Sequence, residues 1–567
     1  MQVFREAIIK LLKKEVKKPI ELETPPDSKL GDYAFPCFEL AKELKKSPIE
    51  ISRNLASKLK PNKYIREIKS TGPYINFFVN NEILNELIIK KIISEKEKYG
   101  FSSNKQRVVI EFPAPNTNKP LHLGHVRNML IGESLSRILE FNGSKVFRVN
   151  MNNDRGIHIC KSMLAYKKYG KNKTPESEKI KPDHFVGNYY VLFNKKLKEH
   201  PELEDEAQAM LRKWEQGDQE TIKLWKKMNN WAFTGFNQTY KKFGIKHVKV
   251  YNESDYYKQG KKVVMDELKK GIFERDEKGN IAVNLEKYNL PNKILLRSDG
   301  TSVYMTQDLI LAKLKYNDFK MDKSIFVVGS EQKLHFRQLF KILELIGFKN
   351  IDGCYHLAYG MIYLPEGKMK SREGTVVDAD NLVDGMIALA RKEIQKRHDL
   401  DKKEINKRAE QIGMGALIFF ILKYDALKDF VFNPKESISF EGETGPYIQY
   451  AHARICSILR RFGRKSDPDF IKKADLSSLR EREEIGLIKL LGKFPDVVED
   501  AASSYKPSLI SRYLLELSQS FNEFYHIHQI LKEREKLRNA RILLIYCIMQ
   551  VLKNGLYLLG IEAPERM

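Results

Sequence analysis

The sequence is poor in cysteine and has no uninterrupted apolar run that would span a bilayer. Its five cysteines are scattered over 567 residues, without a C-x-x-C pair or a histidine at metal-ligand spacing. A disulfide framework and a zinc site are therefore not expected, and a reducing compartment fits. The longest apolar run, residues 542–552, is shorter than the roughly 18–20 residues that cross a membrane. It predicts a buried helix in a cytoplasmic protein with no membrane partner.

Internal repeats and low-complexity tracts are also absent, whereas positive charge is abundant. The chain has 99 Lys and Arg against 74 Asp and Glu, a formal net charge of +25. Such an excess attracts polyanions, so nucleic acid is the first partner to consider. A proteome that favours lysine everywhere would give the same excess, so charge alone leaves the choice open. The length predicts several domains.

Three regions differ in their periodicity and predict a multidomain α/β plus all-α protein. Residues 1–103 mix helical and strand-like stretches, which predicts a small α+β N-terminal domain that ends in a polar linker. Residues 104–378 contain strand 107–112, a helix over 126–141 and strand 145–149, the repeating unit of a Rossmann-type doubly wound parallel sheet. A helical, lysine-rich insertion at about 160–245 interrupts this domain. Residues 379–567 predict a C-terminal helical bundle.

The elements expected within these regions follow from apolar spacing. The N-terminal helices are predicted over 2–18, 37–59 and 81–98, with strands at 64–69 and 74–79; after the insertion, short strands return at 248–250, 281–285, 294–297 and 324–328. The bundle helices are predicted over 380–397, 404–424, 446–464, 482–502, 507–533 and 537–559, with loops marked by Pro434, Pro468, Pro495 and Pro507.

Two histidines stand at the junction between the first strand of the sheet and its helix, in PAPNTNKPLHLGHV (113–126). A nucleotide in an open α/β sheet lies at this kind of junction, over a helix N-terminus. His122 and His125 can face one ligand, and imidazole N–H groups stabilise charge on phosphate oxygens. Gly124 lets a base or ribose approach the backbone. The motif alone also occurs in nucleotidylyltransferases, and two incidental histidines would look the same.

A second motif, GKMKSREG at 367–374, holds Lys368, Lys370 and Arg372 between glycines. Alone it would be interpreted as a solvated basic loop. An H-x-G-H near the first strand followed by a K-M-x-x-x loop is, however, the double signature of class I aminoacyl-tRNA synthetases.

The chain resembles an arginyl-tRNA synthetase almost from end to end. The segments that carry the resemblance, in the family's order, are APNTNKPLHLGHVRNMLIGE, NMNNDRGIHICKSM, YMTQDL, VVGSEQKLHFRQLF, GMIYLPEGKMKSREGTVV, GPYIQYAHARICSILRR and GLYLLGIEAPERM. The resemblance implies an arginine–tRNA ligase. This enzyme activates L-arginine with ATP to arginyl-adenylate and transfers it to the 3′-terminal adenosine of tRNA(Arg).

The resemblance also carries implications for domains and partners. Residues 1–103 would contact the elbow of the tRNA, and the C-terminal bundle would bind the anticodon. Mg²⁺ would accompany ATP and be held mostly by the phosphates, no zinc is expected, and a monomer is expected. The family typically needs bound tRNA to form the adenylate.

One departure from the class I pattern concerns the phosphate-binding lysines. Ser371 stands where the second lysine of the loop is usual, and arginyl enzymes commonly place a lysine just before the first histidine instead. Lys119 matches that place, and Lys370 is a rival candidate. The resemblance therefore implies catalysis by Lys119, His122, His125 and Lys368, and an ATP site formed by Lys119, His122, Gly124, His125, Met361, Lys368, Met369 and Ser371.

The substrate's guanidinium requires carboxylates and neutral acceptors. By the family pattern the arginine site comprises Asn116, Glu253, Tyr304, Asp308 and Gln332, with Asp255 as an alternative to Glu253. Tyr304 and Asp308 share one helical face. For tRNA, Tyr447, Tyr450 and Arg454 lie on one predicted helical face, where aromatics could stack on bases. Core packing explains that stripe equally well.

Three other interpretations are considered. A cysteinyl synthetase would need zinc-binding Cys and His, and a nucleotidylyltransferase would not need the C-terminal helical domain. An inactive synthetase-like tRNA-binding protein would not need His122, His125 and Lys368.

Overall fold

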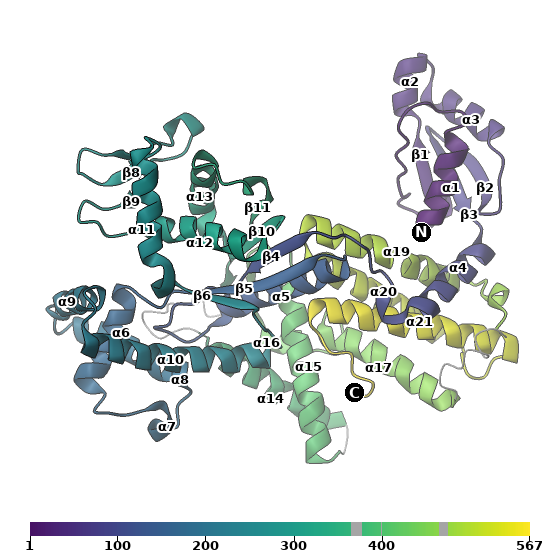
Figure 1. Cartoon of the computed structure of the whole chain (residues 1–567). Coiled ribbons are helices and arrows are strands. Elements are labelled where there is room, and N and C mark those ends of the chain that lie inside the picture. Colours follow the sequence, from purple (N-terminus) through teal and green to yellow (C-terminus); the bar gives the residue numbers. More distant parts are fainter. Residues whose placement is uncertain (364–376, 398–399, 464–473) are drawn as a thin grey trace.

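The computed structural model describes residues 1–363, 377–397, 400–463 and 474–567. The molecule is elongated, with the small N-terminal domain at one end, a central parallel sheet, a helical insertion on one side and the C-terminal bundle on the other (Figure 1). The strands predicted at 64–69, 74–79, 107–112, 145–149, 248–250 and 324–328 are all strands in this structure.

The central sheet positions the site. Its five described strands are all parallel in the order β11-β10-β4-β5-β6, with β4 Arg107–Glu111, β5 Lys145–Asn152, β6 Lys249–Asn252, β10 Lys323–Gly329 and β11 Cys354–Tyr359. Strand order reverses at β4, which pairs with β5 on one side and β10 on the other. Ligands of open α/β sheets bind in the crevice at such a switch point. The edge strand β11 was not predicted, because CYHLAY is only half-buried and lacks an alternating apolar pattern.

The strands predicted at 281–285 and 294–297 lie outside this sheet. They form β8 (Ile281–Val283) and β9 (Lys293–Leu296), which join β7 (Glu274–Arg275) in a separate antiparallel sheet. The helices of this half are α11 Glu253–Lys269, α12 Tyr304–Phe319 and α13 Lys333–Leu345.

Helix α5 (Leu123–Phe141) begins in the histidine motif and is buried on nearly all sides. A Cβ added to Gly132 would come within 2.4 Å of the Phe112 ring, so glycine permits this close packing against the sheet. On its other side, α5 meets the bundle, where the Ser134 hydroxyl donates to the Leu558 carbonyl at 2.9 Å. Helix α5 is therefore enclosed between sheet and bundle.

The insertion consists of five helices with their own apolar core, as the pattern over about 160–245 predicts. They are α6 Ile157–Tyr169, α7 Pro175–Glu178, α8 Pro182–Leu197, α9 Leu203–Glu215 and α10 Gln219–Lys242.

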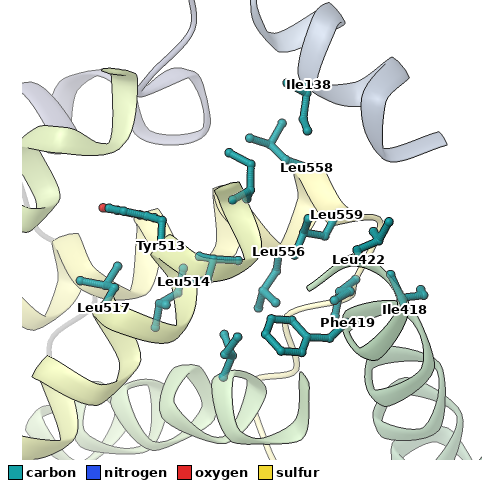
Figure 2. Close-up of a cluster of buried hydrophobic side chains, with 14 of the residues drawn as sticks. Ile138, Ile418, Phe419, Leu422, Tyr513, Leu514, Leu517, Leu556, Leu558 and Leu559 are labelled. Atoms are coloured by element: carbon teal, nitrogen blue, oxygen red, sulfur yellow. The ribbon is translucent and has the colours of Figure 1, made fainter. Parts of the chain in front are cut away.

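The C-terminal region is helical as predicted, apart from a short parallel pair of β12 (Ile362–Tyr363) with β13 (Phe430–Val431). Its helices are α14 Ala379–Arg397, α15 Lys402–Leu422, α16 Pro434–Ser437, α17 Gly445–Phe462, α19 Arg482–Ser504, α20 Pro507–Ile527 and α21 Glu535–Leu559. Helix α21 is long and apolar enough to cross a membrane by composition, but 78% of its most apolar window is buried. Figure 2 shows its leucines packed among side chains of α5, α15 and α20.

One proline expectation was wrong. Pro434 and Pro507 begin helices, and Pro468 lies outside the described residues, but Pro495 lies inside α19. Proline cannot donate to the carbonyl four residues earlier. That carbonyl, on Leu491, instead accepts a hydrogen bond from the Tyr99 hydroxyl at 3.0 Å, so the helix continues.

The N-terminal domain packs three helices on an antiparallel sheet of order β1-β3-β2. Its elements are α1 Gln2–Leu12, β1 Tyr33–Pro36, α2 Phe38–Leu44, α3 Pro48–Lys58, β2 Ile65–Thr71 and β3 Tyr74–Val79, followed by the connecting helix α4 Asn81–Glu95. The helix predicted over 37–59 is interrupted. Lys45 adopts a left-handed φ of 51° and Pro48 starts a new helix.

Candidate active site

The loop that follows β4 is held at the carboxyl end of the sheet by hydrogen bonds to β5. The Ala114 N–H donates to Asn150 Oδ1 at 3.1 Å, and the Asn153 N–H donates to the Pro115 carbonyl at 3.0 Å. Asn116 forms a parallel bridge with Asn153. The sequence-predicted residue Asn116 therefore lies at the carboxyl ends of β4 and β5.

The two histidines of the motif cap α5 with their ring nitrogens. The His122 N–H donates to Nδ1 of His125 at 3.1 Å, and the Gly124 N–H donates to Nδ1 of His122 at 3.1 Å. The ring centroids lie 4.0 Å apart. Because each Nδ1 accepts, this geometry assigns the proton of each neutral ring to Nε2.

The protonation state of these rings follows from their surroundings. Burial lowers the pKa of His122 to about 4, with a further contribution from the Lys119 charge. Burial, the neighbouring His122 and Lys119 lower the pKa of His125 well below its ordinary value. Both imidazoles are therefore neutral at pH 7, and each keeps one Nε2–H donor for a ligand.

Lys119 and His122 line one pocket of about 380 Å³ against helix α8. Burial lowers the pKa of Lys119. A Cβ at Gly187 would lie 2.6 Å from Cδ of Pro120, so α8 packs directly on the motif. Met361 is 44% exposed, and its carbonyl accepts a hydrogen bond from the Arg127 guanidinium of α5 at 3.3 Å. The remaining predicted loop residues, Lys368, Met369, Lys370 and Ser371, lie outside the described residues.

Arg127, which the sequence interpretation missed, holds the backbone around this site. Its guanidinium, 1% exposed, donates to the carbonyls of Gly360 at 2.6 Å, Ala426 at 2.8 Å and Lys428 at 2.8 Å. It also lies 4.7 Å from the Phe430 ring centroid. An arginine next to the apolar residues Val126, Met129 and Leu130 of a buried helix was the available signal. Its carbonyl partners lie more than 230 residues away and could not be predicted.

Three of the residues predicted to bind the substrate arginine lie in or directly before the first turns of α12 and α13. Tyr304 is the first residue of α12 and 66% exposed, and Asp308 lies one turn later. An Asp308 carboxylate oxygen lies 2.6 Å from Nε2 of His335 on α13. Gln332 is exposed directly before α13.

The charges of four carboxylates act on the buried Tyr256 of α11. Burial and the negative charges of Asp308, Glu253, Glu111 and Asp154 raise the pKa of its hydroxyl well above the ordinary value. Such a region is suited to a cationic guanidinium. Between the two alternatives for α11, Glu253 is buried, whereas Asp255 is exposed.

Two of these carboxylates already have cationic partners that the sequence interpretation missed. Glu253 lies 3.2 Å from the Arg155 guanidinium, which also contacts Glu215 of α9 at 2.8 Å. Glu111, at the end of β4, lies 2.7 Å from the fully buried Nζ of Lys315. A carboxylate that ends a buried strand was a signal for Glu111. Burial raises the pKa of Glu253 to about 7 despite the opposing Arg155 charge.

The three residues predicted to contact tRNA do not act as one group. Tyr450 and Arg454 line a cleft of about 660 Å³ on α17, and the Arg454 guanidinium lies 4.7 Å from the Tyr450 ring centroid. Tyr447 packs against the main apolar core instead. Half of the other residues that line the cleft are cationic or aromatic, namely Arg408, Phe440, Arg460, Arg461, Tyr525 and Arg566.

Comparison with known families decides what this architecture is. The model described as "tRNA synthetases class I (R), catalytic domain" matches residues 88–434. The "Arginyl tRNA synthetase N terminal domain" matches residues 1–79, and the "DALR anticodon binding domain" matches residues 448–567. The chain belongs to the arginyl-tRNA synthetase family.

Relatives and solved structures of the arginyl-tRNA synthetase family agree over the whole chain. The Arginine--tRNA ligase of Treponema denticola is 46% identical over 565 residues, 98% of this chain and 96% of that protein. The corresponding protein of Borrelia duttonii is 42% identical over 97% of this chain and 94% of its own. The Thermus thermophilus arginyl-tRNA synthetase structure has a TM-score of 0.84 at 28% identity, with both chains fully covered. The family and the three-part fold expected from the sequence are confirmed. A cysteinyl synthetase and a nucleotidylyltransferase are excluded.

Proposed function

We propose that this chain ligates L-arginine to tRNA(Arg) at the crevice between β4 and β10, with ATP as the energy source. The observation that carries the proposal is the arrangement of Lys119, His122 and His125 at the start of α5. Lys119 and His122 line one pocket there, and the ring of His125, also neutral, lies 4.0 Å from that of His122. This donor set suits a triphosphate over a helix N-terminus.

At the phosphate end, Lys119 supplies a point charge and His122 and His125 supply hydrogen bonds. Charge grows on the phosphorus oxygens in the transition state, and donors that are already oriented stabilise it. Gly124 gives the nucleotide access to the backbone. Lys368, Met369 and Ser371 complete the proposed ATP site together with Met361, and Lys370 remains the rival to Lys119.

At the amino-acid end, Asp308 and Tyr304 receive the substrate guanidinium, with Gln332 as a neutral acceptor. Asn116 holds the α-amino and carboxylate end near the phosphates. Glu253 contributes negative charge while paired with Arg155. Glu111 is added to the proposed pocket because its charge acts on the same Tyr256 hydroxyl as the others.

The reaction has two steps. A carboxylate oxygen of arginine attacks the α-phosphorus of ATP, the bond to the β-phosphate oxygen breaks, and pyrophosphate leaves. The 2′-hydroxyl of the terminal tRNA adenosine then attacks the carbonyl carbon of arginyl-adenylate, loses its proton and releases AMP. The chain's side chains position the reactants and stabilise charge, which is the main source of rate in such transfers.

The arginine-rich cleft of α17 is the proposed anticodon contact. Exposed aromatics beside guanidinium groups accept unstacked bases. Tyr450 and Arg454 have this character, and Tyr447 now has a packing role. Residues 1–103 are proposed to contact the tRNA elbow.

We also propose which metal ion, compartment and oligomeric state the reaction involves. Mg²⁺ enters with ATP and is held mainly by the phosphates. No zinc is required, the enzyme acts as a cytoplasmic monomer, and bound tRNA is needed for arginine activation.

A charging assay tests this function. Purified protein, ATP, Mg²⁺ and total tRNA are incubated with each amino acid in turn, and aminoacyl-tRNA is measured. Arginine alone should be attached. Attachment of another amino acid would contradict the substrate, and no attachment at all would indicate an inactive tRNA-binding protein. Adenylate formation with and without tRNA tests the tRNA requirement.

A further inference from the structure

A cluster of charged side chains joins the helical insertion to the first turn of α14. It comprises three cations and three carboxylates: Lys181, Asp183 and His184 at the start of α8, Lys242 at the end of α10, and Asp378 and Asp380 at the start of α14. Nε2 of His184 lies 2.9 Å from a carboxylate oxygen of Asp378. The cluster ties two parts of the chain that are nearly 200 residues apart.

This cluster reaches the proposed phosphate pocket. Residues 377–379 run antiparallel to the histidine motif, with the Leu123 N–H donating to the Val377 carbonyl and the Ala379 N–H donating to the Leu121 carbonyl, both at 3.0 Å. Asp378 and His184 line the same pocket as Lys119 and His122. A carboxylate therefore stands in the wall of a pocket proposed to receive a triphosphate.

An uncompensated carboxylate at that place would repel the phosphates and cancel part of the attraction of Lys119. We propose that His184 is a positioning residue for ATP: its imidazolium neutralises Asp378 and holds that carboxylate against α8. The proposal rests on the proposed function, in which Lys119 and His122 receive the triphosphate.

The other cations of the cluster are directed to Asp380. Lys181 Nζ lies 2.6 Å from one of its carboxylate oxygens, and Lys242 Nζ lies 3.0 Å from the other. Within the described ranges, His184 is the cation that pairs with Asp378. Burial alone would lower the pKa of His184, but the carboxylates of Asp378 and Asp380, 2.9 and 3.7 Å from its Nε2, and the charge of Asp183 raise it to about 9. His184 is therefore cationic at pH 7.

A divalent metal is the competing explanation for this cluster, since ligand atoms of Asp183, His184 and Asp380 lie within 4.8 Å of one another. The ammonium groups of Lys181 and Lys242 already neutralise these carboxylates. The same space cannot hold two ammonium groups and a metal ion, so charge compensation by side chains is favoured.

Steady-state charging of the full-length enzyme tests the role of His184. His184→Gln keeps a polar side chain of similar size but removes the charge. The KM for ATP should rise about five- to tenfold, as expected for one uncompensated nearby charge, while the KM values for arginine and tRNA stay within about twofold. The double variant His184→Gln/Asp378→Asn should restore the KM for ATP to within about twofold of wild type. Asparagine at 378 keeps the Oδ1 acceptor that caps α14 through the N–H groups of Asp380 and Asn381.

Rescue separates charge compensation from simple structural support. If His184 only supported the fold, removal of its partner would not restore ATP binding, and the double variant would be as impaired as the single one. That outcome overturns the inference. Thermal melts check folding, and if His184→Gln does not fold, Asp378→Asn alone decides. Its KM for ATP should equal or fall below that of wild type, and a rise would contradict the inference.

Two further variants distinguish a failure of the His184 inference from a failure of the proposed phosphate site. His200→Gln is the matched control, because His200 is an exposed insertion histidine paired with Glu202 and should change no constant. Lys119→Ala tests the proposed function in the same assay. If Lys119→Ala raises the KM for ATP and His184→Gln does not, the inference is wrong and the phosphate site stands. If neither changes it, the proposed phosphate site itself is wrong.

Discussion

The two ends of the proposed active site are built in different ways. At the phosphate end, Lys119, His122 and His125 come from one stretch, 113–126, whose histidines hydrogen-bond to the backbone of the same stretch. The amino-acid end collects side chains from β4, α11, α12 and α13, and three of its carboxylates already have a partner: His335, Arg155 and Lys315. A local motif fixes its own geometry, whereas the distributed pocket depends on the tertiary fold.

The difference extends to charge. Among the described residues, the phosphate end consists of neutral imidazoles and one ammonium, and Asp378 is the carboxylate there that opposes a bound anion. The amino-acid end buries acidic groups, and a buried carboxylate is tolerated mainly when it is paired and hydrogen-bonded. Substrate arginine must therefore bind beside side chains that already neutralise part of the negative charge of the pocket.

The largest effect is expected at the phosphate end. His122→Ala removes an Nε2–H donor and the N-cap of α5 together. The turnover number for charging should fall by about 10²–10³, as for loss of one donor to a developing anion, and unfolding should become easier by about 1 kcal/mol because the cap is lost. Charging kinetics and urea unfolding measure the two effects.

His122→Asn provides the matched variant, because asparagine is a good N-cap. It should restore the stability but not the rate. Charging by His122→Ala or Lys119→Ala within a few-fold of wild type would show that the assigned roles are wrong.

These two ends also differ in how far the sequence predicts them. The strand, the motif and the helix of the phosphate end are contiguous, so spacing alone placed His122 and His125 at a helix start. The partners of Arg127, Glu253 and Glu111 are distant in sequence, and no local pattern links Glu111 to Lys315 or Arg155 to Glu215. The interrupted helix at Lys45 and the edge strand β11 were missed because each depends on backbone or packing context.

The next largest effect is expected at the amino-acid end. Asp308→Asn removes a charged acceptor for the substrate guanidinium. The KM for arginine should rise roughly ten- to one-hundred-fold, equivalent to the roughly 1.5–3 kcal/mol of a hydrogen bond to a charged group. The KM for ATP should stay within about twofold. Steady-state charging at varied arginine measures both.

Asp255→Asn is the control for this variant, because Asp255 is exposed on the same helix as Glu253. It should leave the KM for arginine unchanged. An equal change in both variants would indicate a general field of negative charge rather than a specific contact.

The arginine-rich cleft of α17 belongs to neither end of the proposed active site and provides a third test. Tyr450→Ala removes an exposed aromatic from the arginine-rich cleft. The KM for tRNA should rise about five- to tenfold, at the lower end of the roughly 1–3 kcal/mol of stacking one base on an aromatic ring. The KM values for ATP and arginine should not change. Tyr447→Phe, which keeps the core packing of that ring, should affect none of the three, and a loss of tRNA affinity there would return Tyr447 to the contact surface.

The smallest effect is a difference in pH dependence between the two ends. Glu253 has a pKa raised to about 7 by burial, and bound arginine favours its ionised form. Arginine affinity is therefore fully present above pH 7 and is lost as pH falls through that value, so the KM for arginine should rise about three- to fivefold from pH 8 to pH 6. His122, with a pKa near 4, stays neutral throughout this range. In excess Mg²⁺ the KM for ATP should accordingly show no histidine inflection near pH 6.5.

Glu253→Gln tests whether Glu253 causes the pH dependence of the KM for arginine. It removes the titrating group but keeps a side chain of the same size beside Arg155. The KM for arginine should then be flat between pH 6 and pH 8. If the inflection persists in Glu253→Gln, another carboxylate of the cluster around Tyr256 titrates, and Asp154, whose pKa burial raises to about 6, is the next to replace. If instead the KM for ATP carries the inflection, the phosphate end is not the neutral site that its hydrogen bonds indicate.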